Sequence, residues 1–479
     1  MRHKYYSSSS EKLKKRIKEI ELQIEEGEVE IASDECAEAE ITDLEINDNI
    51  LEKEDEKAKR TGRKKLPDNL AREEIVLNPE EQCPGCGSNN MRKISDDVSE
   101  VLEYVPSSFK VIRYIRPRCA CNECDKIVQA YAASKTIDKG KAGAGLLAHI
   151  LIQKYCNHLP LYRQSEMYKR EDIEISRSTM AGWVGQCSKL LEPLVEEIRK
   201  TVFASSQIHG DDTPVRVLAP GRGKTKIGRL WCYVRDGRNH GDNETPAVCY
   251  YYSPDRKGSR PLEHLLEYKG VLHADAYSGY DKLYKNEDGS ETAIEESACW
   301  SHARRKFYEI TIINENAKIA EQVVLQISEL YKIESAIRGI PSDERLEHRQ
   351  KYSKDIVDKL FTYIKSNLKK LPKKGETVKA INYALNNEQA LKRFLENGKV
   401  EIDNNAVERA IKPVALGRKN WMFAGSDTGG ERAANIYTII ETAKMNKLNP
   451  WKHLRTVLAN IQDHNSSKLA DLLPWNIII

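Results

Sequence analysis

The order of apolar, β-branched runs in the middle of the chain is the feature that most constrains its fold. Three strand-like runs follow one another in hairpin succession, a helical stretch comes next at about 259–268, and two more runs complete the series. The five runs occupy 207–218, 229–236, 247–253, the segment that ends at Asp275, and 292–299. Because a helical crossover returns the chain in its original direction, we expect the first and fourth strands to lie side by side and parallel.

Three acidic residues are associated with this series. Asp211 lies in the first run, in H-G-D-D-T-P, and Asp275 closes the fourth, in V-L-H-A-D-A-Y. Glu408 lies further along, in the helical string E-I-D-N-N-A-V-E-R-A. We expect the three carboxylates to meet in one cleft and to bind two divalent cations about 3.5–4 Å apart. Such a pair of ions activates an attacking oxygen and stabilises the leaving oxygen of a phosphodiester.

Other acidic residues compete for these three places. Asp212 follows Asp211, but successive side chains of a strand point to opposite faces, so only one of the two can face the cleft. Glu431 and Glu441 also lie in helical strings and are alternatives to Glu408. A single acidic residue at the end of a strand is usually just solvated, so the interpretation depends on all three acids together.

Two Cys-x-x-Cys pairs precede this region. Cys83 and Cys86 form the first pair, and Cys121 and Cys124 form the second. Alternating runs between them predict a β-hairpin that returns the second pair to the first, so that four thiolates can bind one zinc ion tetrahedrally. Cys119 is a fifth thiol that could replace Cys121 or lie outside the site, and a turn without metal is the alternative interpretation.

Residues 140–203 contain three amphipathic helical stretches. Ser176 or Ser178 can cap the third, and the short polar connection before it is typical of the turn in a helix-turn-helix. Arg177, Ser178 and Thr179 would then lie at the N-terminal end of a recognition helix, where side chains and free N–H groups contact phosphates and bases. Simple three-helix packing is equally compatible with the pattern.

Two further groups of residues are candidates for DNA contact. His302, Arg304 and Arg305 open a helix directly after the last strand, and a second group follows Glu408: Arg409, Arg418, Lys419 and Trp421. We expect the first group to position phosphates near the carboxylates and the second to hold a DNA end, with the tryptophan stacked on a base. The alternatives are a solvated helix start and a tryptophan buried against the sheet.

Composition limits the class of protein. The 479 residues carry a net charge of only +3, so contact with nucleic acid depends on local basic patches rather than on a global field. Eleven cysteines, without a signal peptide or an apolar run long enough to span a bilayer, favour a reducing cytoplasm and argue against a membrane partner. Five cysteines outside the paired motifs are expected to be small core residues: Cys156, Cys187, Cys232, Cys249 and Cys299.

These segments predict a multidomain α+β protein. A ribonuclease-H-like α/β catalytic core would carry a helical insertion and would follow a zinc-binding β unit and a helical, helix-turn-helix-like domain. The expected units are a charged, partly helical N-terminal segment and linker (1–64), the zinc-binding domain (65–135), the helical DNA-binding domain (136–203), the first part of the core (204–310), the insertion (311–400), the second part of the core with the acidic helix (401–449) and a C-terminal helical tail (450–479).

Several strings of the sequence are long and unusual in composition. They include C-P-G-C-G, K-Y-C-N-H-L-P-L-Y-R-Q-S-E, C-W-S-H-A-R-R-K-F, E-I-D-N-N-A-V-E-R-A and G-R-K-N-W-M-F-A-G-S-D-T-G-G-E-R. In these strings, and from roughly Lys65 to Trp475, the chain resembles the large transposase of the sixty-six family of bacterial insertion sequences. The resemblance implies a DDE-type, TnpC-like transposase whose acidic triad falls on Asp211, Asp275 and Glu408, and it favours Glu408 over its rivals.

The family resemblance also implies an activity and partners. Such an enzyme cleaves DNA with water at the terminal inverted repeats of its own element and joins the freed 3′-OH ends to target DNA. It uses two Mg²⁺ ions per active site, with Mn²⁺ as a substitute, and one structural Zn²⁺. A homo-oligomer on paired ends, two small accessory proteins of the same element and a nucleoid-associated location are implied as well. A hydrolysis-only nuclease of the same fold and a non-catalytic DNA-binding regulator are the alternative functions.

Overall fold

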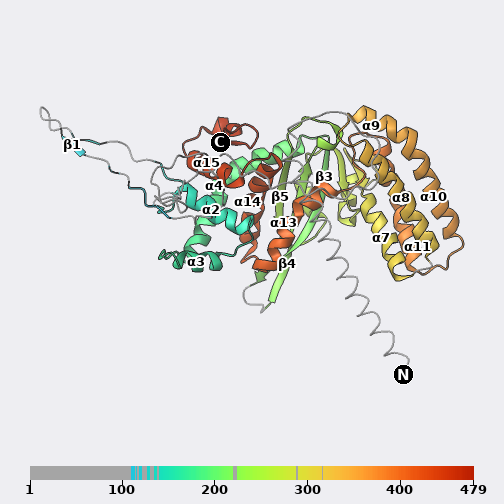
Figure 1. The fold of residues 1–479 in the computed structure, drawn as a ribbon, viewed down its shortest axis with the longest axis horizontal. Coiled ribbons are helices and arrows are strands. Elements are labelled where there is room, and N and C mark those ends of the chain that lie inside the picture. Colours follow the sequence, from blue (N-terminus) through green and yellow to red (C-terminus); the bar gives the residue numbers. More distant parts are fainter. Residues whose placement is uncertain are drawn as a thin grey trace, which may run out of the picture. The chain divides into compact units, whose positions relative to one another are not determined.

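A five-stranded mixed sheet forms the centre of the fold (Figure 1). Three antiparallel strands come first in the chain and two parallel strands join them, in the spatial order β5-β4-β3-β6-β7. The prediction that the first and fourth strands are parallel neighbours is confirmed, since β3 pairs with β6 in parallel. The strands are β3 (Gln207–Ala219), β4 (Lys224–Arg235), β5 (Ala247–Ser253), β6 (Gly270–Ala274) and β7 (Ile294–Ala298).

The computed structural model describes most of the chain from residue 140 onwards. The described residues are 109–113, 115, 118–120, 127–129, 134–137, 140–219, 224–286, 288, 290–314 and 317–478. Within them, a short antiparallel pair, β1 (Arg118–Ala120) and β2 (Ile127–Gln129), brackets the second Cys-x-x-Cys pair in the sequence. The predicted segment 1–64 and the predicted zinc ligands lie outside the described residues: Cys83, Cys86, Cys121 and Cys124.

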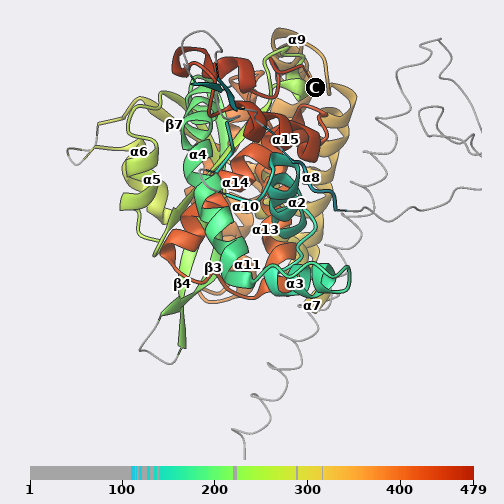
Figure 2. The same ribbon diagram turned by 90° about the vertical axis from the view of Figure 1, so that its left-hand side faces the viewer.

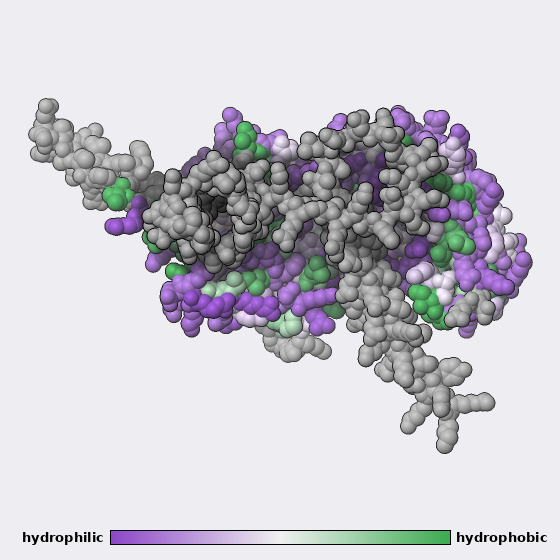
Figure 3. Space-filling view, in the orientation of Figure 1, coloured by the Kyte–Doolittle hydropathy of each residue, from purple (hydrophilic) through white to green (hydrophobic). Residues whose placement is uncertain are grey.

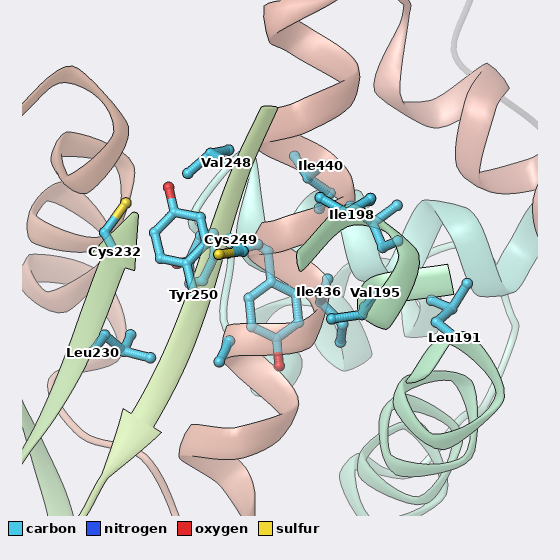
Figure 4. Packing of buried hydrophobic residues seen from close by; sticks show 14 of the residues in the cluster. Leu191, Val195, Ile198, Leu230, Cys232, Val248, Cys249, Tyr250, Ile436 and Ile440 are labelled. Carbon is cyan, nitrogen blue, oxygen red and sulfur yellow. The ribbon is translucent and has the colours of Figure 1, made fainter. Parts of the chain in front are cut away.

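The main core lies between the sheet and helices from distant parts of the chain. Two long helices, α4 (Arg177–Phe203) and α14 (Asp427–Met445), contact each other and pack on β5 (Figure 2), and their residues Ile198 and Ile436 belong to the same buried cluster as Val248 (Figure 4). A third, α13 (Asn405–Trp421), packs on β3. The other elements around this core are α2 (Ala144–Tyr155), α3 (Leu161–Lys169), η1 (Arg238–His240), α5 (Ser259–His264), η2 (Ser278–Tyr280), α6 (Asp281–Tyr284), α15 (Pro450–Asn460) and η5 (Ser466–Leu472).

Helix α14 protects an edge of the sheet. β5 is the outermost strand on its side, and α14 places two threonine hydroxyls against its backbone. Thr438 accepts a hydrogen bond from the Tyr250 N–H at 3.0 Å, and Thr442 accepts one from the Val248 N–H at 3.3 Å. An open strand edge invites pairing with another chain, so these contacts close an edge that would otherwise be reactive.

The isolated cysteines occupy the core as predicted. Cys187, Cys232, Cys249 and Cys299 are buried, Cys156 is half-buried, and all five are free thiols. Cys232 and Cys249 lie on adjacent strands β4 and β5 among apolar neighbours (Figure 4). They fill space as small apolar side chains.

Two predicted elements have different bounds in the structure. β4 begins before the predicted start at 229, because its backbone ladder with β3 continues past the apolar run. The helix predicted for about 259–268 ends at His264, because Leu265 leaves the helical conformation and enters the main core. In both cases contacts with distant parts of the chain, rather than the local sequence pattern, determine the bounds of the element.

The segment between β7 and α13 is helical and has a core of its own (Figure 1), and the predicted start of the insertion at 311 falls inside its first helix. Trp300 lies in this core with edge-to-face contacts to Phe361 and Phe394, at ring-centroid distances of 6.2 and 6.3 Å. We call this segment the helical insertion. Its elements are α7 (Trp300–Ile313), α8 (Lys318–Ala336), α9 (Ser342–His348), the π-helical turn η3 (Arg349–Ser353), α10 (Lys354–Leu368), α11 (Glu376–Asn386), α12 (Glu388–Lys392) and η4 (Arg393–Leu395).

A buried ionic network joins the helices of the insertion to the chain that returns to the sheet. Arg349 is fully buried; it donates to Glu334 at 2.7 Å and to the Val400 carbonyl at 2.7 Å. Arg345, also buried, donates to Glu334 at 3.2 Å and to Glu401 at 2.7 Å. Charges removed from water are tolerated only when they are paired and hydrogen-bonded, so these side chains act as one unit.

The described surface is predominantly hydrophilic, with separate hydrophobic patches (Figure 3). Among the exposed large apolar side chains, Ile227 and Leu325 are each 60% exposed. No helix in the described part of the chain is long and apolar enough to cross a membrane.

We predict that Arg349→Ala lowers the free energy of unfolding by about 3–5 kcal/mol, because it leaves the Glu334 carboxylate buried without its main partner. Urea denaturation measures the change. Lys359→Ala is the matched control, since it removes an exposed ion pair with Asp355 on the same insertion and should change stability far less. Equal effects of the two substitutions would show that the buried network does not stabilise the insertion.

Candidate active site

The two predicted aspartates come level with each other on neighbouring parallel strands. The register of β3 and β6 places His209 opposite His273. Asp211 and Asp275 each lie two residues further along, so they reach the same height on the sheet and the same face as those histidines. Asp211 lies within β3, and Asp275 directly follows the last residue of β6.

Glu408 approaches the two aspartates from α13. It lies in the first turn of that helix, and its Oε1 atom is 3.8 Å from Nδ1 of His302. The negative charges of Asp275 and Glu408 both act on Asp211. The structure therefore brings together the three acids that the sequence predicts.

The environment of Asp211 favours a bound cation. Burial, followed by the negative charge of Asp275, raises the pKa of Asp211 to about 8, although the Asp212 N–H donates to its Oδ1 atom at 2.6 Å. Neighbouring carboxylates with little solvent repel one another, and a divalent cation relieves that repulsion. Carboxylate oxygens are also the ligands that Mg²⁺ prefers. The donor set of Asp211, Asp275 and Glu408 thus fits the predicted metal.

The side chain of Asn404 joins α13 to β3. Asn404 is fully buried; its Nδ2 donates to the Gly210 carbonyl at 3.0 Å, and its Oδ1 lies 2.9 Å from Nδ1 of His209. These contacts are made next to Asp211 in one element and one turn before Glu408 in the other. They therefore set how far apart the two catalytic candidates lie.

A pair of buried histidines beside the carboxylates was not predicted from the sequence. His209 and His273 are buried with their rings stacked at a centroid distance of 5.2 Å, and burial lowers the pKa of both, so the rings are neutral near pH 7. Each stands two residues before an acid, in H-G-D and H-A-D, on strands predicted to be neighbours. That repetition was the signal available in the sequence.

Asp212 has partners of its own away from the triad. Its side chain is almost fully buried; it forms an ion pair with Arg229 at 3.0 Å and accepts a hydrogen bond from Arg256 at 2.8 Å. Arg256 also stacks over the ring of Tyr277, 3.8 Å from its centroid. This placement agrees with the expectation that Asp211 and Asp212 face opposite sides of the strand. The two arginines had not been identified from the sequence.

The two alternatives to Glu408 lie elsewhere on α14. Glu441 is buried and paired with Lys444 at 2.9 Å. Glu431 is exposed to solvent. Only Glu408, among these three glutamates, contributes to the charge that acts on Asp211.

The basic residues that open α7 differ in their environments. His302 is half-buried beside Glu408. Arg304 lies over the ring of Tyr308, 5.3 Å from its centroid, and Arg305 is exposed. One member of the predicted group thus reaches the carboxylates, and Arg305 is open to a ligand from solvent.

The basic residues of α13 lie on a more open surface. Arg409 and Lys419 are exposed, and the half-buried Arg418 donates to the Pro214 carbonyl. Trp421 is half-buried and packs against the main core, which is closer to the alternative interpretation than to a free stacking platform. Contact of these residues with DNA stays a prediction.

The start of α4 is open to solvent. The Ser176 side chain caps this helix by accepting from the Thr179 N–H at 3.1 Å, so the first of the two predicted capping residues is the one used. Arg177, Ser178 and Thr179 are all exposed. Their side chains are therefore available to a partner.

Family models match almost the whole chain. The model described as the transposase IS66 family matches residues 139–432, the range that contains the three acids. The other three are the zinc-finger binding domain of transposase IS66 (80–125), the IS66 C-terminal element (438–475) and the transposase C of IS166 homeodomain (1–75). The zinc-finger match covers the four predicted zinc ligands.

Curated proteins from Sinorhizobium fredii (strain NBRC 101917 / NGR234) are similar to most of the chain. The uncharacterized protein y4hP is 37% identical over 99% of this chain and 87% of its own length. The uncharacterized protein y4qI is 39% identical over 86% of this chain and 77% of its own length. Because the first family model spans more than half of the chain, the protein belongs to the IS66 family of transposases.

Proposed function

We propose that this protein is a DDE transposase that cleaves the terminal inverted repeats of its own insertion sequence and transfers the 3′-OH ends into target DNA. The observation that carries the proposal is the convergence of Asp211, Asp275 and Glu408 from two parallel strands and one helix. This arrangement supports the proposal of a ribonuclease-H-like core, and the family match supports a DNA-processing enzyme.

The three carboxylates would hold two Mg²⁺ ions, or Mn²⁺ in their place, which supply activation of the attacking oxygen and stabilisation of the leaving oxygen. Asp211 and Asp275 provide ligands from the sheet, and Glu408 provides one from α13. Asn404 keeps the helix at a set distance from the sheet. Water attacks in the first step and the freed 3′-OH in the second, so no covalent protein–DNA intermediate forms.

The DNA is bound by surfaces around this centre. Arg177, Ser178 and Thr179 read the end sequence. His302, Arg304 and Arg305 position phosphates near the carboxylates, and a second group holds the DNA end: Arg409, Arg418, Lys419 and Trp421. Cys83, Cys86, Cys121 and Cys124 hold one structural zinc ion, in agreement with the zinc-finger match. The active form is a homo-oligomer on paired ends, assisted by two small proteins of the same element.

We predict that Asp211→Asn, Asp275→Asn and Glu408→Gln each reduce end cleavage and joining by at least about 100-fold while leaving end binding intact, because loss of one anionic ligand disrupts the metal site. Single-turnover cleavage of an end-containing duplex in Mg²⁺ measures the effect. Glu431→Gln, at an exposed position of α14, is the control. Normal activity of Glu408→Gln together with loss of activity in Glu431→Gln would mean that the third acid is wrongly assigned. If the unmodified protein cleaves DNA ends but does not join them to target DNA, a nuclease would be favoured over a transposase.

The zinc unit gives an independent prediction. Purified protein should carry about one zinc per chain, and Cys83→Ser or Cys124→Ser should remove it and weaken DNA binding more than catalysis on pre-bound ends. Elemental analysis measures the zinc, with Cys156→Ser as a control. Zinc retained in both variants would contradict the proposed cluster, and loss in Cys119→Ser but not in Cys121→Ser would reassign one ligand.

Sequence readout by α4 can be tested separately. Replacing Arg177 and Thr179 with Ala should reduce discrimination between the element's ends and random duplex; loss of one guanine contact costs about 1–3 kcal/mol at one base position. Affinities for both duplexes at several salt concentrations distinguish base contact from phosphate contact, because a phosphate contact lowers the salt slope by about one. Lys200→Ala, at the other end of α4, is the control. If the variant still discriminates the element's ends from random duplex as well as the unmodified protein does, the helices of 140–203 only pack together and do not read the DNA sequence.

A further inference from the structure

Glu408 belongs to a second group of metal-binding side chains besides the acidic triad. Atoms of Cys299, His302 and Glu408 that can bind a metal lie within 4.8 Å of one another. The three come from the end of β7, the first turn of α7 and the first turn of α13. We call them the thiol–imidazole group.

The geometry of His302 suits a shared ion better than a hydrogen bond. Its Nδ1 atom is buried, has no hydrogen-bond partner within the described part of the chain, and lies 3.8 Å from Oε1 of Glu408. That distance is too long for a hydrogen bond. It suits two ligands that each lie about 2.0–2.2 Å from one ion. Both side chains are partly open to solvent, 26% and 31% exposed, so an ion can reach them.

Burial, followed by the negative charges of Asp403 and Glu408, raises the pKa of the Cys299 thiol, and two backbone N–H groups act in the opposite direction. Cys299 is the N-cap residue of α7, and its Sγ accepts the Asn404 N–H at 3.2 Å, at the N-terminus of α13. Two helix N-termini therefore meet at this sulfur. Backbone N–H groups and helix dipoles favour the thiolate that a metal ion binds.

We propose that Cys299, His302 and Glu408 form a binding site for a thiophilic divalent cation such as Zn²⁺, with water or a phosphate oxygen as the fourth ligand. A sulfur, an imidazole nitrogen and a carboxylate form a ligand set for zinc, whereas Mg²⁺ requires oxygen ligands. Binding replaces the thiol proton, which is released to solvent. Zinc and magnesium then compete for Glu408, so zinc inhibits; this consequence rests on the proposed function.

Direct binding is tested with Cd²⁺ added to full-length protein that already carries its structural zinc. We expect the ultraviolet thiolate-to-cadmium absorption of the unmodified protein to exceed that of Cys299→Ser by the amount that one bound thiolate contributes. His302→Ala should need at least about 10-fold more Cd²⁺ than the unmodified protein to reach half of its final absorption. Cys156→Ser, a half-buried cysteine elsewhere, should match the unmodified protein. Any exchange at the paired cysteines contributes equally to all four proteins. Identical titrations of Cys299→Ser and the unmodified protein would overturn the site.

Inhibition is tested by adding Zn²⁺ to end cleavage in Mg²⁺, with each protein normalised to its own rate without zinc. Half-inhibition of Cys299→Ser should require at least about 10-fold more zinc than that of the unmodified protein. If zinc inhibits Cys299→Ser and the unmodified protein equally, zinc and magnesium do not compete for Glu408, even if cadmium binds the thiol–imidazole group. Full activity of Glu408→Gln would instead reject the proposed catalytic role of Glu408, while the cadmium titration still decides whether the thiol–imidazole group binds metal.

Discussion

One buried amide holds together the parts of the structure on which the site depends. Asn404 bonds to His209 and Gly210 of β3 through its side chain and to the sulfur of Cys299 through its backbone N–H. Its partners are far away in the sequence, so the contact joins three segments that local structure would leave independent. A buried amide that lost these partners would be left unsatisfied, which costs about 1–3 kcal/mol for each group. The position of Glu408 relative to Asp211 follows from this single side chain.

The same site shows what a sequence can and cannot predict. Asp211 and Asp275 could be paired in advance, because the order of strands and helix matches that of ribonuclease-H-like folds, in which the first and fourth strands are parallel neighbours. The approach of Glu408 could be assigned only through family resemblance, since no periodic pattern encodes how α13 packs on the sheet. Asn404 lies in the string E-I-D-N-N-A-V-E-R-A, but its partners lie 105 to 195 positions away in the sequence. Long-range polar contacts of this kind lack a local signal.

Adjacent carboxylates on β3 have opposite electrostatic environments. Asp212 is compensated by Arg229 and Arg256, so it belongs to the structure of the protein. Asp211 is buried and has negative neighbours instead of a cationic partner; burial, followed by the charge of Asp275, raises its pKa. Strand alternation creates this contrast, since neighbouring side chains face different surroundings. A run of two aspartates thus provides one residue for stability and one for the proposed chemistry.

The helical insertion is attached so that its size need not disturb the acids on either side of it. The chain leaves the sheet at Trp300 and returns at Ile402, and the Trp300 N–H donates to the Ile402 carbonyl at 3.0 Å. The network of Arg345 and Glu401 lies beside this junction. The two ends of the insertion are hydrogen-bonded to each other at this junction, which we call the neck. That contact offsets the entropy cost of closing a long loop, so residues added within the insertion cost little stability. Glu408 can therefore follow a long insertion and still meet Asp211, because its position is set by the neck and by Asn404 rather than by the helices between them.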